Sequence, residues 1–397
     1  APDPSKLRKL VAELEPPRKA VGSWEGCVSP AESWEFLGLS HFCKRTGSDG
    51  DSARSLHREW NSLNLMQRQA IHRAISSLDY QLILGMPGTG KTSTVAFLVR
   101  CLRLLGKTVL VTAYQHSAVD NLLLKLQSCG ETFLRLGNIK QVHDELREST
   151  VNTRDGMDDG SEDSGELLAR VASHQIIGMT CLGVTTCPLL QNHKRFDVCI
   201  VDEASQLSQP AAIGPLFLAR SFVLVGDHFQ LPPLVRSRRA QAQGMQVSLF
   251  QRLADAHPSA VVRLCDQYRM NGDIMSLCNS LVYDGVLRCG SRAVRDSKLT
   301  YLKVTVPATP SPLKRKDGLI LLGAPRHQSS PPACPPLNAA PQSHKQQQQQ
   351  QEQRASPPSS SVDQSDHWIE NYVLSRDRSV VFLDTDAVNG GGESRSG

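Results

Sequence analysis

Apolar and polar residues follow one another over residues 56–244 in blocks that are typical of alternating strands and helices. Short apolar runs predict buried strands at Leu82–Leu84, Val109–Thr112, Ile176–Met179, Val198–Val201 and Phe222–Val225. Longer runs with helical spacing predict helices, notably Gln67–Leu78, Thr92–Leu105 and Ser117–Leu126. This alternation predicts an α/β fold in which a parallel sheet is covered by helices on both faces. Ligands bind at the carboxyl ends of the strands in such folds.

The pattern changes on either side of this region, and these changes predict the domain organisation. Residues 1–55 are weakly patterned, although Leu7, Leu10, Val11 and Leu14 are spaced as in one amphipathic helix. A second αβ unit begins at about residue 245 and is interrupted by a segment rich in Pro, Gln and Ser, for which we expect disorder. The predicted parts are a connecting segment over 1–55, a first motor domain over 56–244, the start of a second over 245–306, the insertion over 307–366 and a truncated resumption of the second domain over 367–397.

Composition narrows the class of protein. The chain has 397 residues, enough for two domains, and its content of 40% hydrophobic and 21% charged residues suits a globular protein. A net charge of +5 is small for this length, so it permits nucleic-acid binding through a local groove but does not argue for it. The 11 cysteines are scattered, without a C-x-x-C pair, which predicts reduced thiols. No apolar run reaches membrane-spanning length. The first residue is not Met and the last residues are rich in glycine, so we expect a fragment.

The strongest chemical signal follows the first predicted strand. Gly85, Gly90, Lys91 and Thr92 fill the pattern G-x-x-x-x-G-K-[ST] at the start of a predicted helix. The glycines allow the backbone to aim its N–H groups at phosphate oxygens, and the helix N-terminus adds a positive dipole. Lys91 can reach the outer phosphates, and the Thr92 hydroxyl can ligate Mg²⁺. A glycine-rich turn before an ordinary helix is the alternative, but the apolar run before the loop favours a nucleotide site.

Hydrolysis of a nucleotide needs carboxylates, which the strand Val198–Val201 delivers. Asp202 and Glu203 follow this strand directly. Asp202 can hold Mg²⁺ through water, and Glu203 can orient and deprotonate the attacking water. The alternative is a strand that ends in an exposed acidic turn.

Two further polar segments gain meaning only from their context. Gln230 follows the next predicted strand and can contact a terminal phosphate, although the prolines after it are also typical of a structural turn. Arg269 can stabilise the charge on a transferred phosphoryl group, and Tyr268 beside it can stack on a base. A surface arginine next to a core tyrosine is the simpler interpretation of this pair.

Taken in order, the motifs resemble those of superfamily 1 helicases, most of all the 5′-to-3′ branch. The segments that carry the resemblance are Leu63-Asn64-x-x-Gln67, the phosphate loop, Thr112 to Asn121, Asp202 to Ser205, Gly226 to Pro233 and Gln267 to Met270. Within this branch they are most similar to the eukaryotic DNA replication ATP-dependent helicase/nuclease family, over roughly residues 56–293. The resemblance implies a RecA-like P-loop NTPase domain followed by an incomplete second RecA-like domain.

The resemblance also assigns roles to individual residues. It implies ATP contacts at Gln67, Gly85, Pro87, Gly88, Thr89, Gly90, Lys91, Thr92 and Tyr268. It implies catalytic roles for Lys91, Glu203, Gln230 and Arg269, with Glu203 as the base and Arg269 as an arginine finger, and Mg²⁺ contacts at Thr92 and Asp202. It implies contacts to the backbone of single-stranded DNA at Thr112, His116, Ser117 and Asn121.

The implied activity is ATP-dependent 5′-to-3′ movement along single-stranded DNA in Okazaki-fragment processing and end resection. ATP, Mg²⁺, single-stranded DNA and replication and single-strand-binding proteins are the implied partners, and the nucleus, or by family the mitochondrion, is the implied location. The nuclease carboxylates, the iron–sulfur cysteines and two motifs of the second motor domain are not found in this sequence. The iron–sulfur cluster is therefore expected only in the full-length relative, and the fragment is expected to hydrolyse ATP slowly. An RNA helicase of the same superfamily and a nucleotide-binding module without catalysis remain alternatives.

Overall fold

The computed structural model describes residues 4–18, 34–153, 164–191 and 193–298. Contacts divide the chain into one unit of residues 1–297 and another of residues 298–397, of which only Lys298 is described. The predicted insertion over residues 307–366 and the predicted resumption over residues 367–397 lie outside the described residues. No helix in the described ranges combines the length and the apolar character needed to cross a membrane.

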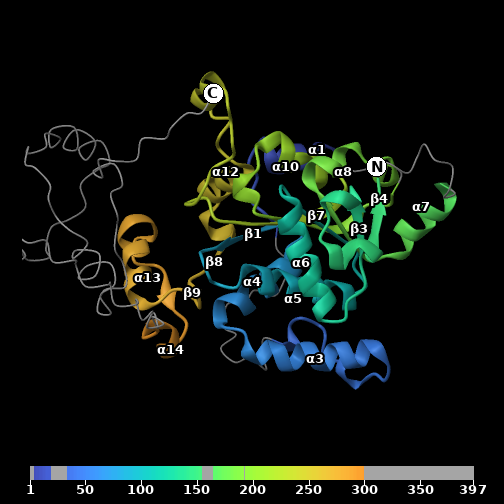
Figure 1. Ribbon diagram of the computed structural model, residues 1–397, viewed down its shortest axis with the longest axis horizontal. Coiled ribbons are helices and arrows are strands. Elements are labelled where there is room, and N and C mark those ends of the chain that lie inside the picture. The colour runs from blue at the N-terminus through green and yellow to red at the C-terminus, as the bar shows by residue number, and fades with distance from the viewer. Residues whose placement is uncertain (1–3, 19–33, 154–163, 192, 299–397) are drawn as a thin grey trace, which may run out of the picture. The chain divides into compact units, whose positions relative to one another are not determined.

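An eight-stranded sheet forms the centre of the first unit (Figure 1). Its strands are β1 (Tyr80–Gly85), β2 (Val109–Ala113), β3 (Leu134–Gly137), β4 (Thr150–Asn152), β5 (Ile176–Thr180), β6 (Phe196–Asp202), β7 (Ala219–Gly226) and β8 (Val261–Leu264). Their order across the sheet is β4-β3-β5-β2-β6-β7-β1-β8, and all neighbouring pairs are parallel. The predicted parallel α/β fold is confirmed, and the carboxyl ends of all these strands lie at one edge of the sheet.

Helices cover both faces of the sheet because successive strand residues point to opposite sides. Along β1, Leu82 and Leu84 pack in one hydrophobic cluster and Ile83 packs in the other. The first cluster includes residues of α7 (Ser164–Ser173), α8 (Cys181–Thr186), α9 (Pro188–Gln191), α10 (Gln209–Leu216) and α12 (Leu249–Ala256). The second includes residues of α3 (Ser48–Ser62), α4 (Leu65–Ser76), α5 (Lys91–Leu104) and α6 (His116–Ser128). Figure 1 shows α8 and α10 on one side of the sheet and α4 and α5 on the other.

The predicted helices are present, and their ends have local causes. The helix α4 begins in a capping box, in which the Gln67 N–H donates to Asn64 Oδ1 (2.9 Å) and the Asn64 N–H donates to Gln67 Oε1 (3.1 Å). The helix α5 ends before Gly106, whose φ of +72° lies in the left-handed region that favours glycine. The predicted N-terminal helix is α1 (Pro4–Val11), and its Leu10 and Val11 are buried.

Several short elements had no clear pattern in the sequence. The strands β3 and β4 contain 4 and 3 residues, too few to show a period. The longer helix α3 buries Ala53, Leu56 and Trp60 among many polar residues. Other short helices before β8 in the described residues include η1 (Phe42–Lys44), η2 (Ile139–Gln141), η3 (Asp144–Ser149), η4 (Ala204–Gln206), α11 (Arg238–Ala242) and η5 (Pro258–Ala260).

The large sheet continues past residue 244, where the second unit was predicted to begin. The strand β8 pairs with β1, and Leu264 lies opposite Gly85. The chain then forms β9 (Asp266–Gln267), α13 (Gly272–Cys278), the π-helix η6 (Asn279–Tyr283), β10 (Arg288–Cys289) and α14 (Arg292–Arg295). The strands β9 and β10 form a separate two-stranded sheet. The chain therefore leaves the large sheet directly beside the end of β1.

Candidate nucleotide site and nucleic-acid interface

Four loops meet at the carboxyl edge of the sheet. The strands β6, β7, β1 and β8 are neighbours in that order, so the segments that follow them lie side by side. These segments contain the predicted catalytic residues Glu203, Gln230, Lys91 and Arg269. The topology therefore brings together residues that are up to 178 positions apart in the sequence.

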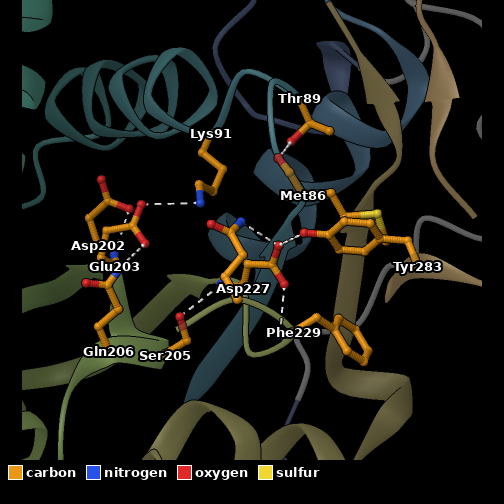
Figure 2. Close-up of polar contacts among 11 residues, drawn as sticks. Met86, Thr89, Lys91, Asp202, Glu203, Ser205, Gln206, Asp227, Phe229 and Tyr283 are labelled. Atoms are coloured by element: carbon orange, nitrogen blue, oxygen red, sulfur yellow. Dashed lines mark hydrogen bonds and ion pairs between the residues drawn. The ribbon is translucent and has the colours of Figure 1, made fainter. Parts of the chain in front are cut away.

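The loop after β1 is folded tightly around two glycines. Gly88 and Gly90 have φ values of +72° and +79°, which glycine adopts without strain. The buried Thr89 donates its hydroxyl to the Met86 carbonyl at 2.7 Å (Figure 2). Pro87 lies between these residues and is partly exposed. A glycine-rich turn at a helix N-terminus presents N–H groups to an anion, as a phosphate requires.

Lys91 links this loop to the carboxylates after β6. Its Nζ lies 3.2 Å from Glu203 Oε1, and 16% of its side chain is exposed (Figure 2). A Cβ atom at Gly85 would lie 2.0 Å from Lys91 Cγ, so the lysine stem passes directly over this glycine. Thr92 follows in the first turn of α5 and is partly exposed. Position 85 therefore needs glycine because the Lys91 stem packs against it.

The two carboxylates at the carboxyl end of β6, those of Asp202 and Glu203, are held in an unfavourable arrangement. Glu203 has φ +50°, a left-handed conformation that costs energy for a side chain other than glycine. Its N–H donates to Asp202 Oδ1 at 2.9 Å. Burial, and next the neighbouring charge of Glu203, raise the pKa of Asp202 to about 6. A bound cation would stabilise the ionised form of this pair, and carboxylate and hydroxyl oxygens suit Mg²⁺.

The loop after β7 is organised by Asp227, which is 1% exposed. Its N–H donates to Ser205 Oγ (3.1 Å), and its Oδ1 accepts from the Phe229 N–H (3.1 Å). Its Oδ2 accepts from Gln230 Nε2 (2.7 Å). The same oxygen accepts from the Tyr283 hydroxyl (2.8 Å), as Figure 2 shows. The Gln230 amide is therefore bonded to Asp227 in this structure.

The segment after β8 contacts the phosphate loop. The Tyr268 N–H donates to the Gly88 carbonyl at 2.9 Å, and a Cβ atom at Gly88 would lie 2.6 Å from Arg269 Cβ. The fully buried Gln267 accepts through Oε1 from the N–H groups of Arg269 (2.9 Å) and Met270 (2.7 Å). These bonds fix the backbone of Arg269 beside Gly88, whereas its side chain is exposed.

Gln67 and Tyr268, the two predicted contacts to adenine, also lie beside the loop. Gln67 Nε2 donates to the Thr89 carbonyl at 3.2 Å. The Tyr268 hydroxyl accepts from Asn64 Nδ2 at 3.2 Å, and its ring lies over Gly290, where a Cβ atom would be 2.2 Å from a ring carbon. With 46% of its surface exposed, the Tyr268 side chain remains accessible to a base.

Of the predicted DNA contacts, His116 begins the helix α6 after β2 and lines a cavity of about 440 Å³. This cavity lies at the carboxyl ends of β2, β3 and β5, and its lining includes His116, Asn138 and Thr180. Ser117 and Asn121 are exposed on the same helix as His116.

Thr112 corrects the prediction. Its side chain is fully buried, and its hydroxyl donates to Cys181 Sγ at 3.1 Å, because the strand β2 continues through this position. It offers no side-chain surface to DNA.

A buried ion pair that the motifs did not indicate supports His116. Arg135 Nε lies 2.8 Å from Asp120 Oδ1, and both side chains are at most 5% exposed. Arg135 Nη2 lies 3.2 Å from His116 Nδ1, and the His143 N–H donates to Asp120 Oδ2 at 3.0 Å. Burial lowers the pKa of Arg135, while the bond to Asp120 opposes this effect. An arginine within a short strand gave no signal in the sequence beyond its mismatch with the apolar pattern.

The comparisons with known proteins agree with this geometry. An AAA domain family matches residues 62–169 and 153–238, and another AAA domain family matches residues 245–388. The chain belongs to the superfamily 1 helicase domains, with a P-loop NTPase fold. It is similar in particular to the DNA replication ATP-dependent helicase/nuclease.

The sequence similarity to these helicase/nucleases is high, but it covers only a small part of their length. The chain is 52% identical to DNA2 of Homo sapiens over 236 residues, which are 59% of this chain and 22% of that protein. It is 46% identical to JHS1 of Arabidopsis thaliana over 293 residues, which are 74% of this chain and 20% of that protein. The chain thus spans about a fifth of these curated relatives.

The comparison with solved structures is weaker. The PRRSV helicase matches 54% of this chain and 35% of its own chain, at 13% identity and a TM-score of 0.31. A score this low supports no conclusion about the site.

Proposed function

We propose that this chain binds ATP with Mg²⁺ and couples ATP hydrolysis to movement along single-stranded DNA, as part of a 5′-to-3′ DNA helicase. The ion pair of Lys91 with Glu203 at 3.2 Å, beside the buried Asp202, carries the proposal. It joins a phosphate-binding loop to a carboxylate pair, the two parts that nucleotide hydrolysis requires. The similarity to DNA replication helicase/nucleases supports DNA as the track. The proposal extends, as the family resemblance implies, to Okazaki-fragment processing, end resection and a location in the nucleus.

Binding of ATP would change the partner of Lys91. The N–H groups around Gly88 and Gly90 would hold phosphate oxygens, and Lys91 would exchange Glu203 for the outer phosphates. Glu203 would then be free to orient water and accept its proton. Asp202 and Thr92 would hold Mg²⁺, which supplies charge neutralisation on the phosphates when it is bound.

The segment after β8 would complete the site. Its backbone contact to Gly88, with Arg269 Cβ beside that glycine, supports a role for Arg269, whose guanidinium would turn to a developing phosphate charge. Tyr268 and Gln67 are both hydrogen-bonded to Asn64 and would contact the adenine. Gln230 would exchange Asp227 for a phosphate oxygen and so report the presence of the nucleotide.

The path of the nucleic acid would follow the ends of β2 and β5. His116 lines the cavity there, and Ser117 and Asn121 are exposed on the same helix; polar groups of this kind suit contacts to a sugar-phosphate backbone. Replication proteins and single-strand-binding proteins would be the partners of such an enzyme. The buried side chain of Thr112 offers no surface for such a contact.

The substitution Glu203→Gln tests the proposal. It keeps the shape of the side chain but removes the base, so we expect ATP to bind at least as tightly while phosphate release falls about 100-fold or more. Binding is measured with a fluorescent ATP analogue and hydrolysis by phosphate release, each with and without oligo(dT) or oligo(U).

Glu145→Gln, at an exposed position in η3, is the matched control and should change neither quantity. Unchanged hydrolysis in Glu203→Gln would contradict the role of Glu203. Stimulation by oligo(U) but not by oligo(dT) would contradict DNA as the track.

A further inference from the structure

The segment that leads to Tyr283 is held in one position. It is a π-helix, Asn279–Tyr283, a form that occurs frequently at functional sites. Asp284 and Gly285 then turn the chain, with φ values of +49° and +77°. The Asn279 side chain joins the two sides of this turn, since Nδ2 donates to the Leu287 carbonyl (2.8 Å) and Oδ1 accepts from the Leu287 N–H (3.0 Å). Tyr283 therefore has little freedom of its own.

The Tyr283 hydroxyl is hydrogen-bonded to Asp227, the same carboxylate that accepts from Gln230. Tyr283 is 6% exposed and donates to Asp227 Oδ2 at 2.8 Å, and its ring meets Phe229 edge-on with centroids 6.1 Å apart. The same Oδ2 accepts from Gln230 Nε2 at 2.7 Å, so Tyr283 and Gln230 share one acceptor atom. Burial raises the pKa of Tyr283, so its hydroxyl stays a donor. A hydrogen bond to an ionised carboxylate is about twice as strong as a neutral one.

The backbone of Asp227 is tied to the loop that carries the catalytic base. The Asp227 N–H donates to Ser205 Oγ at 3.1 Å, two residues after Glu203. A Cβ atom at Gly226 would lie 2.8 Å from the Ser205 nitrogen, so the two loops are in direct contact. Glu203 in turn is the partner of Lys91. A continuous set of contacts thus runs from the phosphate loop to Tyr283 (Figure 2).

The segment of Tyr283 is also the segment of the predicted arginine finger. Residues 265–289 touch the nucleotide site at two places, through Tyr268 at Gly88 and through Tyr283 at Asp227. The strand β9, which precedes Tyr268, pairs with β10, which follows Tyr283. A change at one contact is therefore expected to reach the other.

We propose that Tyr283 is a positioning residue that couples the state of the nucleotide site, read by Gln230 through Asp227, to the segment 265–289. Without a nucleotide, Asp227 holds Gln230 and Tyr283 on one oxygen. When a terminal phosphate attracts the Gln230 amide, that oxygen keeps only Tyr283, and the segment 265–289 shifts with it. This inference rests on the proposed ATP site.

Hydrogen exchange followed by mass spectrometry tests the coupling on the full chain. Wild type, Tyr283→Phe and Tyr80→Phe are compared with and without a non-hydrolysable ATP analogue and Mg²⁺. Tyr80→Phe is the matched control, because it also removes one buried hydroxyl. This hydroxyl donates to the Glu15 carbonyl (3.3 Å), and neither residue belongs to the proposed site. A purely structural role would lower the unfolding temperature but leave the response to the nucleotide unchanged.

In the wild type and in Tyr80→Phe, we expect the nucleotide to change exchange in residues 86–92 and, by about 5-fold, in residues 279–287. In Tyr283→Phe, the response of residues 86–92 remains, and that of residues 279–287 disappears. An equal response of residues 279–287 in all three proteins, or none in the wild type, would overturn the inference.

A lack of response at residues 86–92 in the wild type would instead refute the proposed ATP site. If Tyr283→Phe fails to fold, Asp227→Asn weakens the same contact from the other side. It should give the same selective loss at residues 279–287, and a wild-type response would overturn the inference.

Discussion

The strand β6 carries one aspartate near each end, and the two have opposite surroundings. Near the amino end, Asp197 accepts hydrogen bonds from the Thr108 N–H (3.0 Å), the Thr108 hydroxyl (3.2 Å) and Arg220 (3.4 Å). At the carboxyl end, Asp202 is buried beside Glu203, and both effects raise its pKa to about 6. One strand thus holds a carboxylate that the fold satisfies and another that the fold leaves in need of a cation.

The two ends of β6 therefore differ in what they contribute: Asp197 contributes to stability, and Asp202 contributes to the candidate site at a cost in stability. The hydrogen bonds of Asp197 join β6 to the start of β2 and to β7, so this residue supports the sheet. The backbone strain at Glu203 and the burial of Asp202 both oppose folding. Such local costs are common at binding sites, where a ligand compensates for them.

The largest expected effect concerns Lys91, whose ammonium group lies beside the carboxylates at the carboxyl end of β6. Lys91→Ala removes the ammonium group that pairs with Glu203 and that would bind phosphates. We expect the affinity for a fluorescent ATP analogue to fall about 100-fold or more. Lys107→Ala, at an exposed position, should leave the affinity unchanged. Tight nucleotide binding by Lys91→Ala would remove the phosphate loop from the site.

A paired substitution at the two aspartates should give opposite effects on stability. Asp202→Asn removes a buried charge, so at pH 7 we expect the free energy of unfolding to rise by about 1–2 kcal/mol, while the Mg²⁺ dependence of ATP binding disappears. Asp197→Asn weakens bonds to Thr108 and Arg220, so we expect a loss of about 1 kcal/mol with normal ATP binding. Urea unfolding and nucleotide titrations measure both. A destabilised Asp202→Asn would mean that its charge is already compensated in the protein without ligand.

The smallest expected effect is the pH dependence of Mg²⁺-dependent ATP binding, which the ionisation of Asp202 would cause. The folded pKa of Asp202, about 6, lies above its ordinary value, so the folded state binds this proton more tightly than the unfolded state. Its contribution to stability is therefore full below pH 4 and is lost as the pH rises through about 6. Binding of Mg²⁺ needs the ionised form, so Mg²⁺-dependent ATP affinity should fall about 3-fold between pH 7.5 and pH 5.7.

Glu203→Gln provides a control for that dependence. It removes the neighbouring charge that helps to raise the pKa of Asp202, so the midpoint should move to lower pH. Asp197→Asn should keep the wild-type midpoint. Titrations of the ATP analogue at fixed Mg²⁺ across this pH range measure each midpoint, and an Asp202→Asn protein with the wild-type profile would assign the dependence to another group.

The central strands could be predicted because both of their faces are buried. Each of the strands β1, β2, β6 and β7 contains a nearly continuous apolar run, as is typical of parallel strands that are covered on both faces. The strand β3 was missed since Arg135, buried through its pair with Asp120, interrupts the run. The strand β8 lies at the edge and exposes Arg263, so its pattern is weaker. Single-sequence patterns cannot show a charge that becomes buried by pairing with a distant residue.

For the site, motif spacing identified residues but not their contacts. The positions of Lys91, Asp202 and Glu203 follow from loops at strand ends, and the structure brings them together. Thr112 was predicted both as the last residue of a buried strand and, from the resemblance, as a DNA contact, and its fully buried side chain agrees with the first prediction only. Nothing local marked Tyr283, because its partner Asp227 lies 56 positions earlier. The turn residues Asp284 and Gly285 were the available signal, and they indicate only a change of direction.

The pairing of β8 with β1 sets a condition on where this chain can be divided. β8 covers the outer edge of the strand that leads into the phosphate loop, with Val261 to Leu264 paired to Leu82 to Gly85. A protein cut at residue 244 would expose the backbone N–H and C=O groups of β1 as an open sheet edge, which can pair with other chains and aggregate. Residues that the sequence assigned to a second domain therefore cover the edge of β1, and a shortened protein that keeps the loop after β1 should extend at least through Leu264.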